Sequence, residues 1–418
     1  MVAPLAGVKV VEVTSWMAAP SAAAVLADMG ADVVKVEPPR GDAVRGLMRP
    51  PKSPPGLPSI DYSFTADNRG KRSAAIAVDS PEGAQLVHKL VAGADVFICN
   101  LLHRRQHRYG LDATTLLGVN PRLVHASLTG FGPTGPDAER AGYDVTVFFG
   151  RGAIVDTMTE PGGLAPHPRP AQGDHAAGMA LVAAVLAALR LAEQTGEGQV
   201  VDVNLLAMAA WTMATDLSSV LVDGRQPSKR DRRHVMTPLA GRFRCSDDRF
   251  IVLNMPEARW WAPFCAALER PEWVADPRFD TLRSRYQNMP ELMDMIDEIF
   301  ASKPMHEWSR VLDDAGLISG PAATLAELAA DPQASAAAMF PEIEHPAGGF
   351  RTIGVPFTIH GADIAPRGPA PDVGQHSVEV LGSVGLSPDD VSALAAAGIV
   401  GPASLAGEQG GATEPSVT

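Results

Sequence analysis

Short β-branched runs alternate with longer alanine- and leucine-rich segments in the first third of the chain. The runs predict strands at Val8–Val13, Val33–Glu37, Ser73–Val78, Asp95–Cys99 and Leu123–Leu128. The segments between them predict helices, of which Pro20–Gly30 ends in a glycine and Pro81–Val91 begins with a proline. Strand–helix–strand spacing implies parallel pairing with right-handed crossovers, so we expect a doubly wound α/β sheet.

The middle of the chain is more apolar. Asp174–Ala192 is the clearest helix, and it contains a 14-residue apolar run, Ala176–Leu189, which is too short to cross a bilayer and predicts a buried helix. Gln199–Val203 predicts a buried strand and Leu205–Leu221 a second apolar helix.

After the polar, basic stretch Gly224–Arg233 the pattern changes. Phe243–Leu253 predicts two strands around a turn at Asp247 and Asp248. Helical patterns follow at Trp260–Leu268, Met289–Ala301 and Met305–Ala315, and Ile353–Ile359 returns to a strand pattern. We therefore expect a smaller α+β domain after the α/β part.

Charge and cysteine content narrow the functional classes. The 418 residues carry a formal net charge of −13, which argues against a nucleic-acid or anionic-membrane partner. Cys99, Cys245 and Cys265 form neither a disulfide framework nor a metal spacing, so we expect no metal site and a reducing compartment. No basic segment followed by an apolar run opens the chain, and the cytoplasm is the expected location.

A series of short blocks resembles the class III CoA-transferase family (CaiB/BaiF type), which includes formyl-CoA transferase, carnitine CoA-transferase and 2-methylacyl-CoA racemase. The blocks follow the family's order over about residues 4–400. They are Leu5–Glu12, Leu26–Glu37, Asn68–Ser73, Asp79–Gly83, Leu128–Gly132, Gly142–Asp144, Gly173–Asp174, Thr195–Gln199, Asp276–Phe279 and Gly320–Pro321.

The resemblance implies a Rossmann-like large domain with a smaller α+β domain inserted, and an interlocked homodimer. The expected division is a large CoA-binding domain over 1–223, a linker over 224–237, the small domain over 238–335, a return to the large domain over 336–402 and a disordered tail over 403–418. The expected substrates are an acyl-CoA and a carboxylic acid acceptor. CoA thioester is then a substrate, and no tightly bound cofactor is expected.

Asp174 is the candidate nucleophile, because it matches the family's catalytic aspartate. A carboxylate can attack an acyl thioester, release CoA and then hold the CoA as its own thioester. Asp174 follows Gly173 and opens the apolar helix, where the helix N-terminus is expected to lower its pKa. The alternative interpretation is that Asp174 is a plain helix N-cap.

Two other functions stay open: a 2-methylacyl-CoA racemase and a CoA-thioester binding protein without activity. Racemases of the family carry a histidine at the position of Tyr143, and tyrosine, with a pKa near 10, is a poor base at neutral pH. His175 would point about 100° away from Asp174 on a helix, so it is not expected to be an opposed base. Tyr143 and Asp144 either shape the thioester pocket or anchor a buried loop.

The turn Thr14–Ala18 lacks the glycines of a dinucleotide fingerprint, which argues against a dehydrogenase. The resemblance instead implies a CoA site with Met17 and Ala18 along the pantetheine, Arg40 near the phosphates, Ile76, Ala77 and Val78 beside the adenine, and Asn100, Arg104 and Arg108 in the next loop. That loop departs from the family's Asn-Phe-Arg-Pro-Gly, being more basic and lacking Pro-Gly. A glycine run is also missing around 232–241, which argues against oxalate or formate as substrates.

Overall fold

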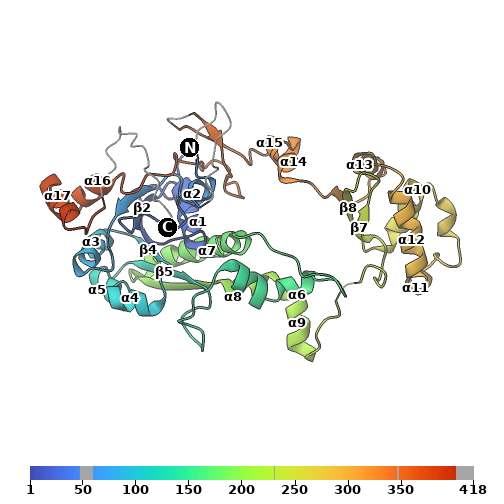
Figure 1. Cartoon of the computed structure of the whole chain (residues 1–418), viewed down its shortest axis with the longest axis horizontal. Helices are drawn as coiled ribbons and strands as arrows, with labels where there is room; N and C mark the ends of the chain where they lie inside the picture. Colours follow the sequence, from blue (N-terminus) through green and yellow to red (C-terminus); the bar gives the residue numbers. More distant parts are fainter. Residues whose placement is uncertain (48–59, 230, 346–347, 402–418) are drawn as a thin grey trace, which may run out of the picture. The chain divides into compact units, whose positions relative to one another are not determined.

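The computed structural model describes residues 1–47, 60–229, 231–345 and 348–401. Within these ranges the chain divides into two compact units (Figure 1). The larger unit contains residues 1–155, 167–222 and the chain from 335 onward, and the smaller unit contains 156–166 and 223–334. The expected disordered tail, 403–418, and most of the expected loop between Gly41 and Tyr62 lie outside the described residues.

A six-stranded parallel sheet forms the centre of the larger unit. Its strands are β1 (Lys9–Val13), β2 (Asp32–Glu37), β3 (Arg72–Ala75), β4 (Val96–Cys99), β5 (Val124–Thr129) and β6 (Gln199–Asn204). Their order is β3-β2-β1-β4-β5-β6, with Val10 opposite both Val33 and Val96. The predicted doubly wound α/β fold is confirmed. The order reverses between β1 and β4, and ligands of such sheets bind at this switch point, beyond the carboxyl ends of the strands.

Successive side chains of the central strands enter two separate cores, one on each face of the sheet. Val10 belongs to the core formed with α1 (Ala18–Asp28) and α7 (Gln172–Thr195). Val11 belongs to the opposite core, which contains α3 (Pro81–Val91), α5 (Ala113–Val119), α16 (Ser377–Gly382) and α17 (Pro388–Ala396). Residues after 376 thus return to the sheet beside β3, where the Ala75 N–H donates to Ser377 Oγ over 3.1 Å.

Small residues bring α1 and α7 unusually close together. A Cβ added at Gly178 would lie 2.2 Å from Ser21 Oγ and 2.8 Å from the Ala18 carbonyl oxygen. Because the Ala18 carbonyl oxygen belongs to the backbone, it cannot move away without moving α1 itself. This contact therefore limits the distance between α7 and α1. It therefore also fixes the position of the first turn of α7, which contains Asp174.

Three predicted elements differ in the structure. β6 is an edge strand rather than a buried one, and Val200 is 54% exposed. The expected helix over 205–221 is two helices, α8 (Leu205–Thr212) and α9 (Ala214–Asp223), bent by 86°. The Thr212 hydroxyl donates to the Met208 carbonyl, a local bond that favours bending. Ile353–Ile359 is not a strand, because Pro356 has no N–H and Gly354 bonds the Met339 carbonyl instead.

One described helix, α7, is long and apolar enough by length and composition to cross a membrane. The pair α8 and α9 meets the same criteria only if the bent pair is counted as one span. One side of α7 is buried against α1 and the sheet, whereas its other side is exposed. The expected buried helix is thus buried on one side only.

The smaller unit contains an antiparallel sheet of β7 (Ala240–Arg244), β8 (Phe250–Asn254) and β9 (Ser319–Pro321). Three α-helices supply core residues: α10 (Trp261–Ala267), α12 (Met289–Phe300) and α13 (Met305–Asp314). A fourth, α11 (Leu282–Gln287), places Arg285 4.5 Å from the centroid of the Trp261 ring. The predicted hairpin and the three predicted helices are confirmed. Aromatic packing defines the core, as in the stacked rings of Phe243 and Phe300, whose centroids are 4.7 Å apart.

The remaining elements are short. They are α2 (Tyr62–Asn68), α4 (His103–Tyr109), the π-helix η1 (Val145–Arg151), α6 (Ile154–Met158), the 3-10 helices η2 (Ala258–Trp260) and η3 (Pro271–Val274), α14 (Leu325–Ala329), α15 (Pro332–Ala336), β10 (Glu342–Ile343) and β11 (Phe350–Arg351).

Candidate active site

A cavity of about 280 Å³ lies at the switch point of the larger sheet. It is lined by Ser15, Trp16, Ala18, Asn100, Leu101, Leu102, Arg104, Arg105, Leu128, Thr129, Gly130, Ala141, Gly142, Tyr143, Asp174 and Leu205. The loops after β1 and β4 are joined beneath it, since the Ser15 N–H donates to Asn100 Oδ1 over 3.1 Å and Asn100 Nδ2 donates to the Ser15 carbonyl over 2.6 Å. The site therefore stands where this fold usually binds its ligand.

Asp174 is the third residue of α7 and reaches this cavity. The helix cap is Ala171, in the left-handed conformation with φ 77°, and no side chain caps the helix. The interpretation of Asp174 as a plain N-cap is therefore wrong, and its carboxylate is not committed to the helix end.

The pKa of Asp174 is raised to about 7, whereas the sequence predicted a lowered value. Burial is the largest cause, and the negative charges of Asp144 and Asp67 add to it, while His175 acts in the opposite direction. A helix N-terminus favours an anion by roughly 0.3–1 kcal/mol, which is too little to outweigh dehydration and two carboxylates.

The turn before Asp174 is held by close packing and by a buried carboxylate. A Cβ at Gly173 would lie 2.5 Å from the ring of Phe148, so only glycine fits there. Asp144 is 2% exposed, and hydrogen bonds from the backbone N–H groups of Val145, Gly173 and Ala171 lower its pKa, although burial dominates and raises it. Asp144 therefore fits the role of a buried loop anchor, the alternative that the sequence left open.

Tyr143 lines the cavity, unlike Asp144, and the residue is 54% exposed. The ring meets Trp16 edge to face, with centroids 5.2 Å apart. Two aromatic side chains thus form one wall of the space that Asp174 faces.

His175 pairs with Asp67 of α2, its Nε2 lying 3.0 Å from Asp67 Oδ1. Asp67 is 4% exposed, and the His175 side chain is 51% exposed. The hydrogen bond to Asp67 is the largest of the effects on the His175 pKa, which is raised. The only prediction for His175 was that it is not an opposed base.

The structure gathers only part of the expected CoA site around the cavity. Ala18, Asn100, Arg104 and Tyr143 line it together with Asp174. Met17 lies beside them but its side chain is buried in a small cluster with Val44 and Phe64.

The other expected residues lie outside this cavity. Arg40 is exposed after β2, and Arg108 is exposed on α4 with its guanidinium 5.8 Å from the Tyr109 ring. Ile76 is fully buried, and Ala77 and Val78 follow it past the end of β3, where the C-terminal segment covers them: Ile76 pairs with Val400 and the Ala77 N–H bonds the Ile399 carbonyl. Their contacts with CoA stay predictions.

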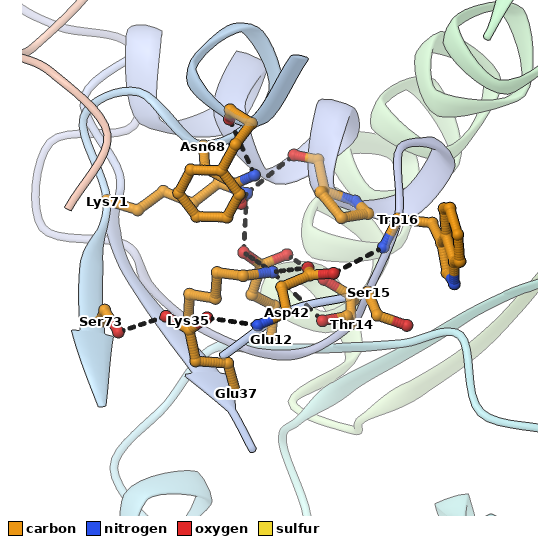
Figure 2. Close-up of polar contacts among 12 residues, drawn as sticks. Glu12, Thr14, Ser15, Trp16, Lys35, Glu37, Asp42, Asn68, Lys71 and Ser73 are labelled. Carbon is orange, nitrogen blue, oxygen red and sulfur yellow. Dashed lines mark hydrogen bonds and ion pairs between the residues drawn. The ribbon is translucent and has the colours of Figure 1, made fainter. Parts of the chain in front are cut away.

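The sequence missed a buried charge network beneath the loop that follows β1 (Figure 2). Lys71 Nζ lies 2.7 Å from Glu12 Oε1, and Lys35 Nζ lies 2.9 Å from Asp42 Oδ2, with all four side chains dehydrated. The other Asp42 oxygen accepts the Trp16 N–H over 3.2 Å, and Trp16 adopts a left-handed φ of 67°. The network therefore supports the strained residue that forms the cavity wall. The signal for it in the sequence was the presence of Glu12 and Lys35 inside predicted strand runs.

Burial and the carboxylates act against each other on the two lysines of this network. Burial lowers the pKa of Lys71 to about 8, with Glu12 opposing it. For Lys35 burial acts in the same direction, but Glu12 and Asp42 outweigh it and the pKa is raised. Both lysines are thus paired cations, rather than free groups for a ligand.

A larger cavity, of about 660 Å³, belongs to the smaller unit and includes three arginines, Arg232, Arg242 and Arg244. Each already pairs with a carboxylate, in Asp297, Glu160 and Asp248 respectively. These charges are mutually satisfied, so this cavity is the weaker candidate despite its size. Among the described residues no cluster of three or more His, Cys, Asp or Glu side chains could hold a metal ion.

The fold and site define a Rossmann-type protein with a dehydrated carboxylate at the switch point. A family model described as CoA-transferase family III matches residues 5–377, and the chain belongs to that family. It is a class III CoA-transferase, as the resemblance predicted.

The relatives match along nearly their full lengths. The chain is 32% identical to (R)-2-hydroxy-4-methylpentanoate CoA-transferase of Clostridioides difficile, covering 93% of this chain and 97% of the relative. It is 30% identical to cinnamoyl-CoA:phenyllactate CoA-transferase of Clostridium sporogenes, covering 93% and 95%. The crystal structure of a CAIB/BAIF family protein from Brucella suis matches with a TM-score of 0.81 and 31% identity, covering 92% of this chain and 100% of that one.

Proposed function

We propose that the chain moves CoA from an acyl-CoA to a free carboxylic acid through covalent intermediates on Asp174. An Asp174 oxygen attacks the thioester carbon, the C–S bond breaks, and a mixed anhydride and CoA thiolate form. The thiolate attacks the Asp174 carboxyl carbon, which releases the donor acid and leaves an aspartyl-CoA thioester. The acceptor carboxylate attacks this thioester and regenerates an anhydride and the thiolate. The thiolate then attacks the acceptor's acyl carbon, giving the new acyl-CoA and free Asp174.

The observation that carries the proposal is the position and state of Asp174. Its carboxylate faces a cavity walled in part by apolar side chains, and its pKa is raised to about 7. A carboxylate with a raised pKa is more basic and more weakly hydrated, and both properties favour attack on a carbonyl carbon. A small, partly apolar cavity also limits the water that would hydrolyse the anhydride.

The remaining cavity residues support a path for the CoA arm. Ala18, Asn100 and Tyr143 would contact the pantetheine, with Arg104 at the mouth, where its side chain is 66% exposed. Arg40 and Arg108 are exposed and available for the phosphates, as the resemblance implied. CoA thioester is the substrate in this scheme, and the scheme uses no resident cofactor. The relatives named for hydroxy acids make a 2-hydroxy acid a reasonable first acceptor to test.

Trapping tests the proposal. The purified chain is incubated with acyl-CoA, treated with borohydride or hydroxylamine, and analysed by peptide mass spectrometry. We expect modification of Asp174 in the wild type, none in Asp174→Asn, and normal modification in Asp313→Asn, which changes an exposed aspartate of α13. An active Asp174→Ala enzyme would overturn the proposal.

Trapping and a deuterium-exchange measurement together separate the alternatives that the sequence left open. A binding protein without activity would give no adduct in any variant. A racemase would incorporate solvent deuterium at the α-carbon of a 2-methylacyl-CoA without any acceptor acid, whereas a transferase requires the acceptor for turnover.

We also propose that the chain forms a homodimer, interlocked as the resemblance implies, with the smaller unit inserted in the larger one. The support is an apolar exposed face on α7, β6, α8 and α9. Trp211 is 76% exposed there, Leu221 78% and Val200 54%. A groove of about 530 Å³ beside Trp211 is lined mainly by alanine, valine and methionine of the same elements. A patch of this kind commonly marks an interface.

Light scattering tests the dimer, and subunit exchange tests the interlocking. Interlocked chains cannot separate without unfolding, so mixed differently tagged dimers should form hybrids only after denaturation and refolding. A monomer in solution would overturn the dimer, and rapid exchange would overturn the interlocking.

We further propose a cytoplasmic location, supported by three free, buried cysteines, which fractionation of cells expressing a tagged chain would test.

A further inference from the structure

The pair of His175 and Asp67 joins the first turn of α7 to α2. His175 directly follows Asp174 on α7. Its Nε2 lies 3.0 Å from Asp67 Oδ1, and Asp67 is almost completely buried. α2 is itself fixed at its N-terminus by the Asp61 side chain, which accepts the Phe64 N–H. Asp67 is therefore a rigidly placed acceptor that determines where the His175 ring stands.

Negative charge predominates around this pair. Asp67, Asp144 and Asp174 all act electrostatically on one another or on His175. The cations nearby are committed elsewhere: Arg69 Nη2 lies 2.6 Å from Asp28 Oδ2. Lys71 binds Glu12, Asn68 and the Pro20 carbonyl oxygen.

Among the residues that the structure describes, the other elements packed on α7 add no free cation, since Arg151 of η1 pairs with Asp137. The only charged side chain of α1 is Asp28, which Arg69 binds, and α8 has none. In the neighbouring strands, His125 of β5 bonds the Leu111 carbonyl through Nε2, and burial lowers its pKa, while Asp202 of β6 is a further carboxylate. Within the described part of the chain, His175 is thus the one imidazole facing three carboxylates.

We infer that His175 is a positioning residue which Asp67 holds in its doubly protonated form beside Asp174, and that its positive charge keeps the Asp174 carboxylate ionised for attack. This rests on the proposed function, in that Asp174 is taken as the nucleophile. His175 does not touch the reacting carbon. It acts through the field at Asp174, as a charge in a partly dehydrated site does.

The direction of the electrostatics agrees with this role. The hydrogen bond that His175 donates to Asp67 raises the pKa of His175, against burial and the charge of Arg69, and this favours imidazolium near neutral pH. His175 in turn lowers the pKa of Asp174, against burial and the neighbouring carboxylates. Without this charge, less of Asp174 would be ionised at neutral pH.

The pH dependence of kcat/KM tests the inference, because that parameter reports ionisations of the free enzyme. His175→Gln keeps an amide donor for Asp67 but removes the charge. An opposite charge nearby shifts a carboxyl pKa by about 1–3 units. Because His175 is half exposed and solvent weakens its effect, we expect the acid limb of the kcat/KM profile to move up by roughly 0.5–1 pH unit. The rate at pH 6 should then fall about three- to tenfold, with little change at pH 9.

Two variants serve as controls. His175→Lys restores a positive charge and should keep the acid limb near that of the wild type. His306→Gln makes the same substitution in the first turn of α13, at an exposed position of the smaller unit, and should change nothing. A double-mutant cycle with Asp67→Asn should show a smaller effect of His175→Gln, since the histidine without its partner is less often charged.

An unchanged acid limb in His175→Gln would overturn the inference, as would a loss of rate that is equal at every pH. If His175→Gln does not fold, the Asp67→Asn variant decides the inference. Histidine NMR should then show a larger neutral fraction of the His175 imidazole near pH 7 than in the wild type. A His175 titration like that of the wild type would refute the inference. Borohydride trapping keeps the two proposals apart. Failure of the pH shift with an intact Asp174 adduct refutes the role of His175 alone, whereas absence of the adduct in the wild type refutes the nucleophile itself.

Discussion

Replacing Asp174 by asparagine should stabilise the protein above neutral pH while it abolishes transfer. The pKa of Asp174 is raised from 3.8 to about 7 in the folded chain. A folded-state pKa above the unfolded value means that the ionised carboxylate destabilises the fold. This destabilisation is absent below about pH 4, grows as the pH rises toward 7, and is complete above it.

The magnitude follows from the shift. About 3 pKa units at 1.36 kcal/mol each give an upper limit of about 4 kcal/mol at pH 8. The side chain is partly exposed, so we expect Asp174→Asn to gain about 1–3 kcal/mol in the free energy of unfolding at pH 8. About half of this gain should already be present at pH 5, because the unfolded carboxyl is then mostly ionised.

Urea unfolding at pH 5, 6, 7 and 8, followed by tryptophan fluorescence, measures this difference. The advantage of Asp174→Asn over the wild type should grow by about 0.5–1.5 kcal/mol from pH 5 to pH 8. Asp313→Asn, exposed on α13, should show no such trend. An Asp174→Asn protein that is less stable at pH 8, or whose advantage is the same at every pH, would contradict the assignment of a dehydrated carboxylate.

Three further outcomes are expected. Gly173→Ala should lower the free energy of unfolding by about 1–3 kcal/mol in urea titrations, since its Cβ would meet Phe148 at 2.5 Å; unchanged stability would show that the turn can relax. Lys71→Met should destabilise by about 3–5 kcal/mol because it leaves Glu12 buried without its nearest cation, and adding Glu12→Gln should recover much of the loss, which thermal unfolding can check. Arg104→Ala should raise KM for acyl-CoA severalfold with kcat unchanged, and an unaltered KM would remove Arg104 from the CoA site.

The sheet was predictable because local signals agreed with the fold. β1, β2, β4 and β5 are β-branched or apolar runs buried on both faces, so periodicity alone located them. The position of β6 was also predicted, but its exposure was not. Whether a strand lies at the edge of a sheet depends on whether another strand pairs with it, and the local sequence does not show this. The bend between α8 and α9 escaped because Thr212 can bond the Met208 carbonyl or solvent, and the sequence does not decide which.

The site was predictable to a similar degree. Asp174 came from a motif block and Asn100 from the loop that the resemblance assigns to CoA, and both line one cavity. The predicted direction of the Asp174 pKa shift was wrong, because burial, the largest cause, and the charges of Asp144 and Asp67 all depend on packing between distant parts of the chain. His175 and its partner were missed for the same reason.

The charge network beneath Trp16 has a consequence for protein engineering. Trp16 forms part of the cavity wall, and its backbone is tied through Asp42 to Lys35, which also bonds the Thr14 carbonyl. A library that randomises only residues 14–18 to admit a new acyl group leaves Lys35 and Asp42 unchanged. Its variants would therefore rest on a charge network that fits the original loop. Productive changes in acyl preference should therefore arise in linked sets that include positions 35 and 42.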